Sequence, residues 1–344
     1  MMADEEREER FEQSRTRERN LGMELVRVTE AAALSAGRWM GTGDKTRVDQ
    51  LAVDAMRQAI DGVDMNGVVV IGEGEKDEAP MLYIGERVGN GTPPDVDVAV
   101  DPVDGTRLLA NGLPGAIAVI ATAERRSMYA TPPGVFYMEK IAVGPVAKGV
   151  IDINAPVAQN LRKIAQARQA HLDDVTVVIL DRPRHAEIIR QIRQTGARIR
   201  LITDGDVFAA VMAAMEDYTG VDVLLGTGGA PEAVLAAAAL KCIGGEIQCK
   251  LWPRNAEERA RMQAGGLNLD QVLTIDDLIK SDDVSFAATG ITTGELLRGV
   301  QYFGRGARTH SLMMRSHSGT VRYIEAHHRW HTIAMQPATP HARG

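Results

Sequence analysis

Residues 96–106 read Val-Asp-Val-Ala-Val-Asp-Pro-Val-Asp-Gly-Thr, and this stretch decides the fold. Its alternating valines predict a strand with one face in a core. Pro102 has no N–H to donate, so we expect the strand to end there and to present Asp101 and Asp104 on a turn. Two such carboxylates suit Mg²⁺ or Mn²⁺, and Thr106 lies close enough to act on a water at that site. The simpler interpretation is an ordinary Asp- and Gly-containing turn after a strand.

A second acidic cluster follows the apolar run 67–71, which predicts a strand buried on both faces. Glu73 is the first charged group after this run and has a glycine on either side. Open α/β sheets place ligand sites at the carboxyl ends of their strands, so Glu73 is a candidate ligand. A solvated acidic loop is the better interpretation of the carboxylates that follow it, Glu75, Asp77 and Glu78.

Two further carboxylates lie in helices. Asp49 falls one turn into a stretch whose apolar residues, from Val48 to Ile60, recur with helical spacing. From spacing alone, Asp49 is a helix-start acid that the helix dipole favours. Glu232 follows the glycine-rich stretch 226–230 and Pro231, which suits a first helical position. This stretch could bind an anion at a helix N-terminus, but it matches neither the nucleotide P-loop nor the dinucleotide fingerprint.

The composition of the chain argues against a nucleic-acid-binding protein and against a membrane protein. The chain has 344 residues, a net charge of −7 and 4% aromatic residues. An acidic chain with few aromatic side chains is not expected to bind nucleic acid. There is no apolar run long enough to cross a bilayer, so we expect no membrane partner. Only two cysteines occur, Cys242 and Cys249, and their spacing fits no zinc or redox motif; we expect a cytoplasmic protein.

The pattern along the chain predicts four segments. Residues 1–20 are crowded with charges and are expected to form a disordered or loosely ordered arm. Residues 21–152 are expected to form an N-terminal α+β domain, and residues 153–330 a C-terminal α/β domain. Strand and helix patterns alternate in the second domain, which predicts parallel strands. Residues 331–344 are expected to be a loose tail.

Polar residues gather after three expected strands of the second half, in the segments 181–185, 203–206 and 226–232. Arg182 and Arg184 carry planar guanidinium groups that suit phosphate oxygens. A single arginine pair is more often a solvated surface feature, but three polar strand ends in succession favour one edge of a cleft. His185 is interpreted as a surface residue at a helix start.

Several of these motifs, in this order, resemble a known family. The stretch 101–106 resembles the metal-binding signature of the lithium-sensitive, metal-dependent phosphomonoesterase superfamily. The fuller set resembles bacterial class II fructose-1,6-bisphosphatases, most closely their actinobacterial branch, from about Met23 to Arg329. The motifs that carry the resemblance are Gly72–Tyr83, Tyr137–Lys140, Asp181–His185, Asp204–Asp206 and Gly228–Glu232.

The resemblance implies a layered α-β-α-β-α sandwich of the sugar-phosphatase type, an α/β fold with two sheets. It implies two or more Mg²⁺ or Mn²⁺ ions bound by Asp49, Glu73, Asp101, Asp104 and Glu232. This reverses the interpretation of Asp49 from spacing alone. Thr106, Glu73 and Asp49 are implied as catalytic residues, Thr106 by helping to activate the attacking water. The implied substrate contacts are Asp104, Gly105, Thr106, Tyr137, Arg182, Pro183, Arg184, Asp204, Gly205, Asp206 and Gly229.

The expected activity is hydrolysis of the 1-phosphate of fructose 1,6-bisphosphate, a gluconeogenic reaction, by a homodimer or homotetramer. One alternative is a phosphatase for another ester, such as sedoheptulose 1,7-bisphosphate or an inositol phosphate. A substrate with one phosphate leaves the two arginines without a partner, which disfavours inositol phosphates. Another alternative is a non-catalytic sugar-phosphate-binding protein. The complete set of acidic residues disfavours that alternative.

Overall fold

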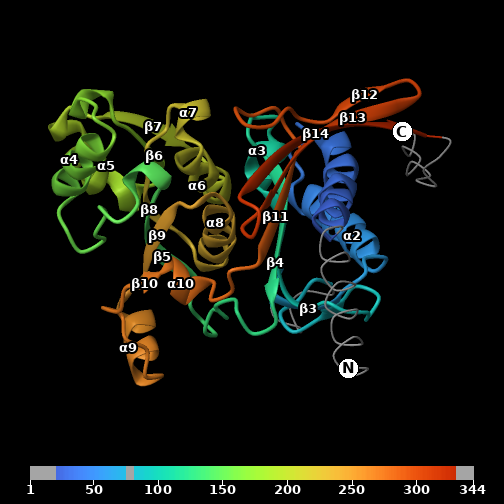
Figure 1. The fold of residues 1–344 in the computed structure, drawn as a ribbon, viewed down its shortest axis with the longest axis horizontal. Helices are drawn as coiled ribbons and strands as arrows, with labels where there is room; N and C mark the ends of the chain where they lie inside the picture. Colours follow the sequence, from blue (N-terminus) through green and yellow to red (C-terminus); the bar gives the residue numbers. More distant parts are fainter. Residues whose placement is uncertain (1–20, 75–80, 331–344) are drawn as a thin grey trace, which may run out of the picture.

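The computed structural model describes residues 21–74 and 81–330. Predictions for the arm, for the tail and for Glu75, Asp77 and Glu78 lie outside these residues. Five layers alternate across the molecule: helices, a sheet, two central helices, a second sheet and further helices (Figure 1). The predicted α-β-α-β-α sandwich is therefore confirmed.

The first sheet has eight strands in the order β12-β13-β11-β4-β3-β1-β2, with β14 paired to β13. Only β1 and β3 are parallel; every other pairing in this sheet is antiparallel. Strands β13 and β14 form an antiparallel hairpin. The strands are β1 (Asn66–Ile71), β2 (Arg87–Val88), β3 (Asp95–Asp104), β4 (Ile117–Glu124), β11 (Val284–Gly290), β12 (Gln301–Phe303), β13 (Gly306–Arg315) and β14 (Thr320–Arg329).

The second sheet has six strands in the order β10-β9-β5-β8-β6-β7. Strands β7, β6 and β8 are parallel, as the strand–helix alternation predicts, whereas β5 is antiparallel to both of its neighbours. The strands are β5 (Tyr137–Val143), β6 (Thr176–Leu180), β7 (Arg198–Ile202), β8 (Val223–Gly229), β9 (Glu246–Leu251) and β10 (Leu273–Thr274). The sheets do not follow the boundary at residues 152 and 153: β5 precedes it, and β11–β14 return to the first sheet. The domain division itself stays a prediction.

Three hydrophobic cores hold the layers together. One packs α2 (Lys45–Ile60) and the helix at residues 21–36 against the first sheet. Another packs α4 (Val157–Ala167) and α5 (Ala186–Thr195) against the second sheet. The largest lies between the sheets and includes α6 (Asp206–Ala214) and α8 (Ala230–Ile243). The remaining helices are η1 (Gly37–Trp39), α3 (Thr106–Ala110), η2 (Pro145–Ala147), η3 (Leu172–Asp174), η4 (Pro183–His185), α7 (Glu216–Thr219), α9 (Ala256–Ala264) and α10 (Ile275–Leu278).

Helix α8 is central because of its composition. Its segment Ala233–Leu240 is entirely buried and consists mostly of alanine, so both sheets can approach the helix closely. A helix that is apolar on every side belongs in an interior. Pro231 lies in its first turn, as predicted, and places Glu232 at the end of the helix that faces the site.

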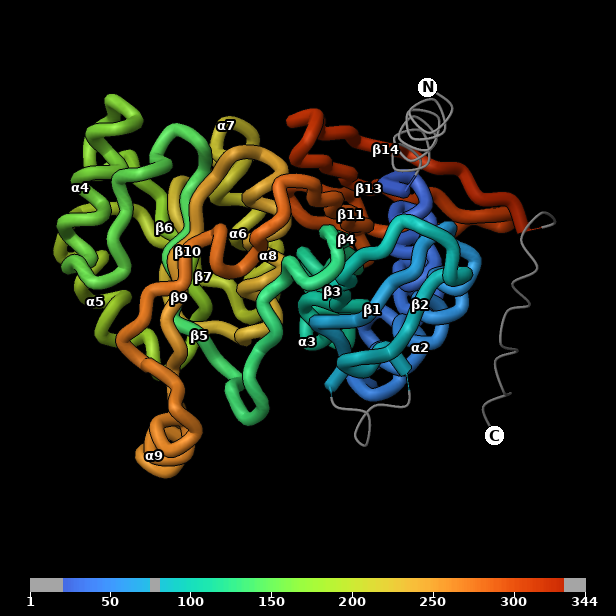
Figure 2. The backbone as a smooth tube through the Cα atoms, turned by 60° about the horizontal axis from the view of Figure 1, so that its bottom comes forward, coloured from blue at the N-terminus to red at the C-terminus, as the bar shows by residue number. Residues whose placement is uncertain are grey.

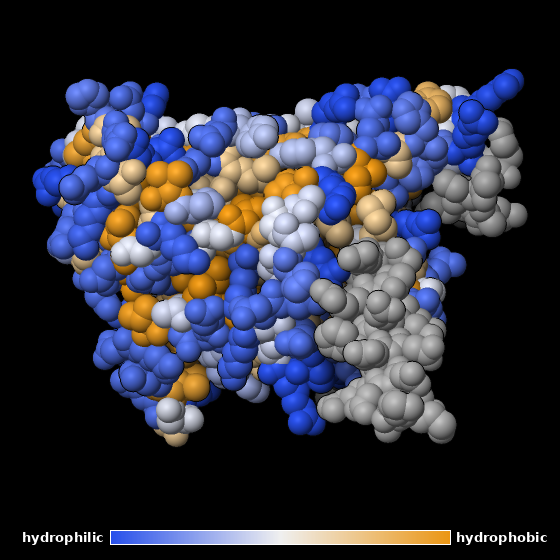
Figure 3. All heavy atoms as spheres, viewed as in Figure 1, coloured by the Kyte–Doolittle hydropathy of each residue, from blue (hydrophilic) through white to orange (hydrophobic). Residues whose placement is uncertain are grey.

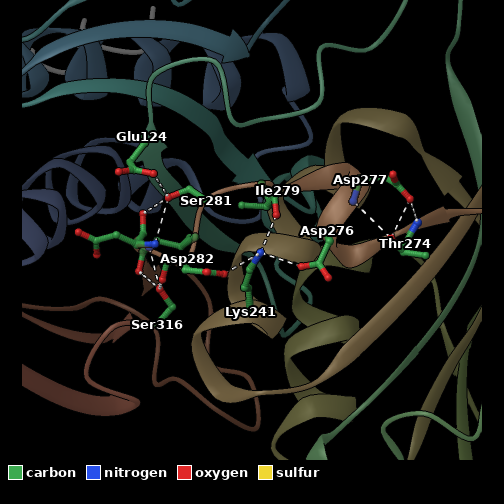
Figure 4. A network of polar contacts seen from close by, with 11 residues as sticks. Glu124, Lys241, Thr274, Asp276, Asp277, Ile279, Ser281, Asp282 and Ser316 are labelled. Atoms are coloured by element: carbon green, nitrogen blue, oxygen red, sulfur yellow. Dashed lines mark hydrogen bonds and ion pairs between the residues drawn. The ribbon is translucent and has the colours of Figure 1, made fainter.

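A polar network fixes the other end of α8 (Figure 4). Lys241 donates to the Asp276 carboxylate at 2.8 Å and to the carbonyl of Ile279 at 2.7 Å. A cation in the last helical turn also complements the helix dipole. Nearby, Ser281 donates to Glu124 at 2.9 Å, which ties the segment after α10 to the end of β4. The network therefore connects the central helix to the first sheet.

On the face of the molecule drawn in Figure 3, hydrophobic side chains lie among hydrophilic ones over the left part and the middle. The exposed large apolar residues include Leu201, Tyr218 and Tyr323. Within residues 21–74 and 81–330, no helix has the length and apolar character needed to span a bilayer.

Candidate active site

A cavity of about 530 Å³ opens between the two sheets and collects residues from both halves of the chain. The predicted residues in its wall are Asp49, Glu73, Asp101, Asp104, Gly105, Thr106, Tyr137, Arg182, Arg184, Asp204, Gly205, Asp206, Gly229 and Glu232. Pro183 is the exception, because it is exposed and does not contribute to this wall. The cavity therefore unites residues up to 205 positions apart, from Asp49 to Arg254.

The end of β3 positions two of the carboxylates, although not as predicted. The strand does not stop at Pro102 but continues to Asp104, with a register shift between Asp101 and Asp104. A bulge tolerates a proline that has no N–H to donate, which explains the difference. Asp101 accepts a hydrogen bond from the N–H of Val103 at 3.0 Å, and Asp104 accepts one from Phe208 at 3.0 Å. Both carboxylates are thus fixed by backbone donors.

The carboxylates raise one another's pKa. Burial, with Asp49 and Glu232 nearby, raises the pKa of Glu73 to about 8. Burial and the charges of Asp104, Glu73 and Glu232 hold the pKa of Asp101 well above its ordinary value. The pKa values of Asp104 and Glu232 are raised mainly by burial and by Asp206. Crowded, partly desolvated carboxylates are unstable in their charged form unless a cation compensates them.

This end of the cavity suits divalent ions. Oε2 of Glu232 is buried without a hydrogen-bond partner, so it is free to coordinate an ion. All candidate ligands are carboxylate oxygens, the donors that Mg²⁺ and Mn²⁺ prefer. Among the described residues, no three acidic, histidine or cysteine side chains are already arranged around a single point as ligands. Ion binding would therefore require side-chain adjustment within the cavity.

Thr106 lies beside this acidic end. Its hydroxyl counteracts the rise that burial causes in the pKa of the Asp49 carboxyl. The hydroxyl also donates to the carbonyl of Val103 at 3.2 Å. Asp49 lies in α2, whose first turn is capped by Asp44 through a 2.9 Å bond from the N–H of Arg47. The helix thus brings Asp49 to the same end of the cavity as the hydroxyl of Thr106.

Two adjacent glycines allow two carboxylates to approach the backbone. A Cβ atom at Gly228 would lie 1.8 Å from Oδ2 of Asp206, and one at Gly229 would lie 1.8 Å from Oε2 of Glu232. Either side chain would displace a carboxylate of the cavity. We predicted a glycine-rich loop here, but residues 223–229 form strand β8. The glycines make room for acidic side chains within a strand.

Arg182 and Arg184 form the part of the cavity wall that we call its basic end, and both side chains are closely held. Arg184 donates from Nε and Nη2 to the carbonyl of Thr227, at 3.1 and 2.7 Å, and its guanidinium lies 5.1 Å from the centre of the Tyr137 ring. Arg182 lies 3.7 Å from Asp204, and the carboxylate of Asp204 also accepts from the N–H of Arg107 at 3.3 Å. The guanidinium groups are thereby held in place beside the cavity.

The prediction that His185 lies on the surface is wrong. Its side chain is 1% exposed, with Nδ1 at 2.7 Å from the carbonyl of Leu180. Its Nε2 accepts from the N–H of Thr227 at 2.7 Å, so the ring is neutral. Burial lowers the pKa of His185. His185 and Arg184 together bind both backbone groups of Thr227 and so fix β8 relative to β6.

Sequence reasoning missed Lys140 and Arg254. Lys140 is buried in β5 and donates to Asp206 at 2.5 Å. Burial alone would lower the pKa of Lys140, but Asp206 and Glu232 raise it above its usual value. Lysine within an apolar strand was a detectable signal, because such a cation needs a buried anionic partner. Arg254 lines the cavity from the segment between β9 and α9, and no sequence pattern marks it as a site residue.

Comparisons with known proteins agree with this geometry. The family model described as "Bacterial fructose-1,6-bisphosphatase, glpX-encoded" matches residues 19–328. A D-fructose 1,6-bisphosphatase class 2/sedoheptulose 1,7-bisphosphatase of Synechococcus is 44% identical over 333 residues, covering 90% of this chain and 95% of the relative. A fructose-1,6-bisphosphatase class 2 of Haemophilus influenzae is 45% identical over 323 residues, covering 90% and 96%. Among solved structures, an extragenic suppressor from Pyrococcus furiosus has a TM-score of 0.31 and 17% identity, covering 57% and 70% of the two chains.

Proposed function

We propose that the cavity of this chain, which belongs to the family of bacterial fructose-1,6-bisphosphatases, binds the reacting phosphate at its acidic end and the second phosphate at its basic end. The protein is a phosphoric monoester hydrolase acting on fructose 1,6-bisphosphate. The observation that carries the proposal is that one cavity is lined both by the carboxylates Asp49, Glu73, Asp101, Asp104 and Glu232 and by Arg182 and Arg184.

At the acidic end, Asp49 and Glu73 would hold one divalent ion, and Asp101, Asp104 and Glu232 another. Bound Mg²⁺ or Mn²⁺ would supply positive charge to the phosphoryl group and to the departing oxygen. Thr106, whose hydroxyl donates to the carbonyl of Val103, would orient the water that attacks phosphorus, with Asp49 nearby. Hydrolysis breaks the bond between phosphorus and the O1 oxygen and yields fructose 6-phosphate and inorganic phosphate.

At the basic end, Arg182 and Arg184 would bind the 6-phosphate, which does not react. Tyr137 and Gly229 would border that phosphate, and Asp204, Gly205 and Asp206 would contact the sugar. Because this binding holds the substrate away from the reacting atoms, its energy positions the 1-phosphate. Gly105 and Pro183 are part of the predicted set, and Pro183 would act only through its neighbouring arginines.

The test is a substrate panel run separately with Mg²⁺ and Mn²⁺. We expect rapid phosphate release from fructose 1,6-bisphosphate, little from inositol 1-phosphate, and none in the presence of a chelator. Comparable turnover of inositol 1-phosphate would contradict the role of the basic end. Sedoheptulose 1,7-bisphosphate belongs in the panel, because the Synechococcus relative is named for both activities.

Two further properties belong to this proposal. A cytoplasmic location is supported by two free, buried cysteines, Cys242 and Cys249, which need no oxidising compartment. Assembly as a homodimer or homotetramer is expected from the family resemblance. Light scattering of the purified protein tests the assembly, and a single mass of one chain at all concentrations would contradict it.

A further inference from the structure

Arg254 lies at the mouth of the cavity, in the segment 252–255 that joins β9 to α9. Helix α9 stands away from the body of the molecule in both views (Figures 1 and 2). The segment 252–255, which precedes this helix, contributes Arg254 to the cavity wall. There Arg254 shares the wall with Phe136, Tyr137, Arg182 and Arg184.

Two contacts hold the Arg254 side chain in place. Glu258, whose side chain is buried, accepts from the backbone N–H of Arg254 at 2.8 Å and from Nε at 2.6 Å. The guanidinium also lies 4.4 Å from the centre of the Phe136 ring. Because the long side chain is already ordered, less conformational entropy would be lost when it binds an anion. The bonds to Glu258 raise the pKa of Arg254, so its charge is permanent.

Arg184 is held in a parallel way. Its guanidinium packs on Tyr137, the residue that follows Phe136, and its Nε and Nη2 bind a backbone carbonyl. Consecutive aromatic residues at the start of β5 thus support two arginines of the same cavity. Tyr137 in turn contacts Trp252 edge to face, with 6.2 Å between ring centres, which connects the segment carrying Arg254 to β5.

The two arginines identified from the sequence already use some of their N–H donors. Arg182 faces Asp204 at 3.7 Å, and Arg184 uses two of its N–H groups on the carbonyl of Thr227. Arg254 is likewise paired, with Glu258, so it would add N–H donors to the site more than net charge. A phosphate monoester carries about 1.5 to 2 negative charges at neutral pH, and its oxygens could accept from a third guanidinium group.

We propose that Arg254 is a third phosphate-binding arginine, which determines the preference of this site for substrates with a second phosphate. This inference rests on the proposed function, since it assigns the basic end to the 6-phosphate. Arg254 would contact the outward oxygens of that phosphate from the cavity mouth, while Arg182 and Arg184 contact it from within. Loss of Arg254 should therefore weaken substrate binding and leave the reacting centre intact.

The experiment compares Arg254→Met with Arg259→Met, an exposed arginine of α9 outside the cavity wall. We expect Arg254→Met to raise KM for fructose 1,6-bisphosphate about tenfold, as loss of a hydrogen bond to a charged group would, with kcat changed less than about twofold. The inhibition constant of fructose 6-phosphate should rise by the same factor, and Arg254→Lys should restore part of the loss. Arg259→Met should change neither constant.

An unchanged KM in Arg254→Met, or an equal change in Arg259→Met, would overturn the inference. A fall in kcat together with a lower melting temperature would assign Arg254 a structural role in anchoring α9, and would also overturn it. Failure of the proposed function has a different result, because the wild-type protein would then release no phosphate from fructose 1,6-bisphosphate.

Discussion

The two ends of the cavity differ in how their charges are compensated. At the acidic end, burial and neighbouring carboxylates raise the pKa values of Glu73 and Asp101, and Oε2 of Glu232 has no hydrogen-bond partner. At the basic end, Arg184 is held by a carbonyl and an aromatic ring. An end with uncompensated like charges is suited to receive cations, whereas an end with ordered cations is suited to bind an anion.

Removing a carboxylate from the acidic end should have the largest effect. Glu73→Gln should lower kcat about 10³-fold, because several kcal/mol of charge stabilisation depend on the ions that Glu73 helps to hold. Phosphate release at saturating Mn²⁺ measures this effect. Glu257→Gln, in the first turn of α9 and exposed, is the matched control. Near-normal kcat in Glu73→Gln would show that the acidic end does not carry the reaction.

Lys140 compensates the buried negative charge of Asp206, so its replacement should mainly lower the stability of the fold. Lys140→Met should lower the free energy of unfolding by about 3 kcal/mol, because it leaves Asp206 buried without its partner. Denaturant unfolding measures the change, and exposed Lys163→Met is the control. The double variant Lys140→Met/Asp206→Asn should recover much of the loss. No recovery would indicate that packing, not charge, is what Lys140 contributes.

Thr106 tests whether the acidic end also positions the nucleophile. Thr106→Ala should lower kcat about 10²-fold, in the range for loss of a group that assists proton transfer, and should raise KM less. Thr106→Ser keeps the hydroxyl that donates to the carbonyl of Val103 and should restore most of kcat. If KM rises while kcat is preserved, Thr106 contacts the substrate and does not assist the attack.

The smallest expected effect concerns the rigidity of the basic end. Burial lowers the pKa of His185 below its value of 6.5 in the unfolded chain. Below pH 6.5 the unfolded state therefore binds more protons than the folded state. The stability that the neutral His185 ring contributes is fully present above pH 6.5 and is lost as the pH falls below it. His185→Gln should make the fall in melting temperature between about pH 6.5 and 5 shallower than in the wild-type protein. Identical slopes would mean that His185 does not hold Thr227 as a neutral ring.

The layers were predictable because their signals are local. The alternating valines of β3 predict the strand but only one buried face, whereas both of its faces are buried in the structure. The apolar, alanine-rich run of α8 specifies a fully buried helix. The course of β3 past Pro102 was not predictable, because a bulge depends on the neighbouring strand β4. The local sequence pattern also did not predict that β11–β14 pair with strands of the first sheet, because strand pairing depends on residues far apart in the chain.

Site residues that belong to a recognisable sequence motif could be predicted, and the others could not. Glu73 and Asp101 directly follow or end predicted strands, so their proximity could be inferred from the sheet rule. Asp49 enters from a helix, and its spacing resembles that of any acid near a helix start. His185 is buried only because β8 covers it, and Arg254 reaches the cavity only through the placement of α9. Such contacts are set by tertiary structure, which spacing along the chain does not record.

The central claim is that the carboxylates of the acidic end hold divalent ions beside a sugar phosphate. Anomalous diffraction from crystals soaked in Mn²⁺ and fructose 6-phosphate tests it directly. We expect at least two manganese peaks among Asp49, Glu73, Asp101, Asp104 and Glu232, with the phosphate of the ligand against Arg182 and Arg184. Manganese bound elsewhere, with none in this cavity, would contradict the claim.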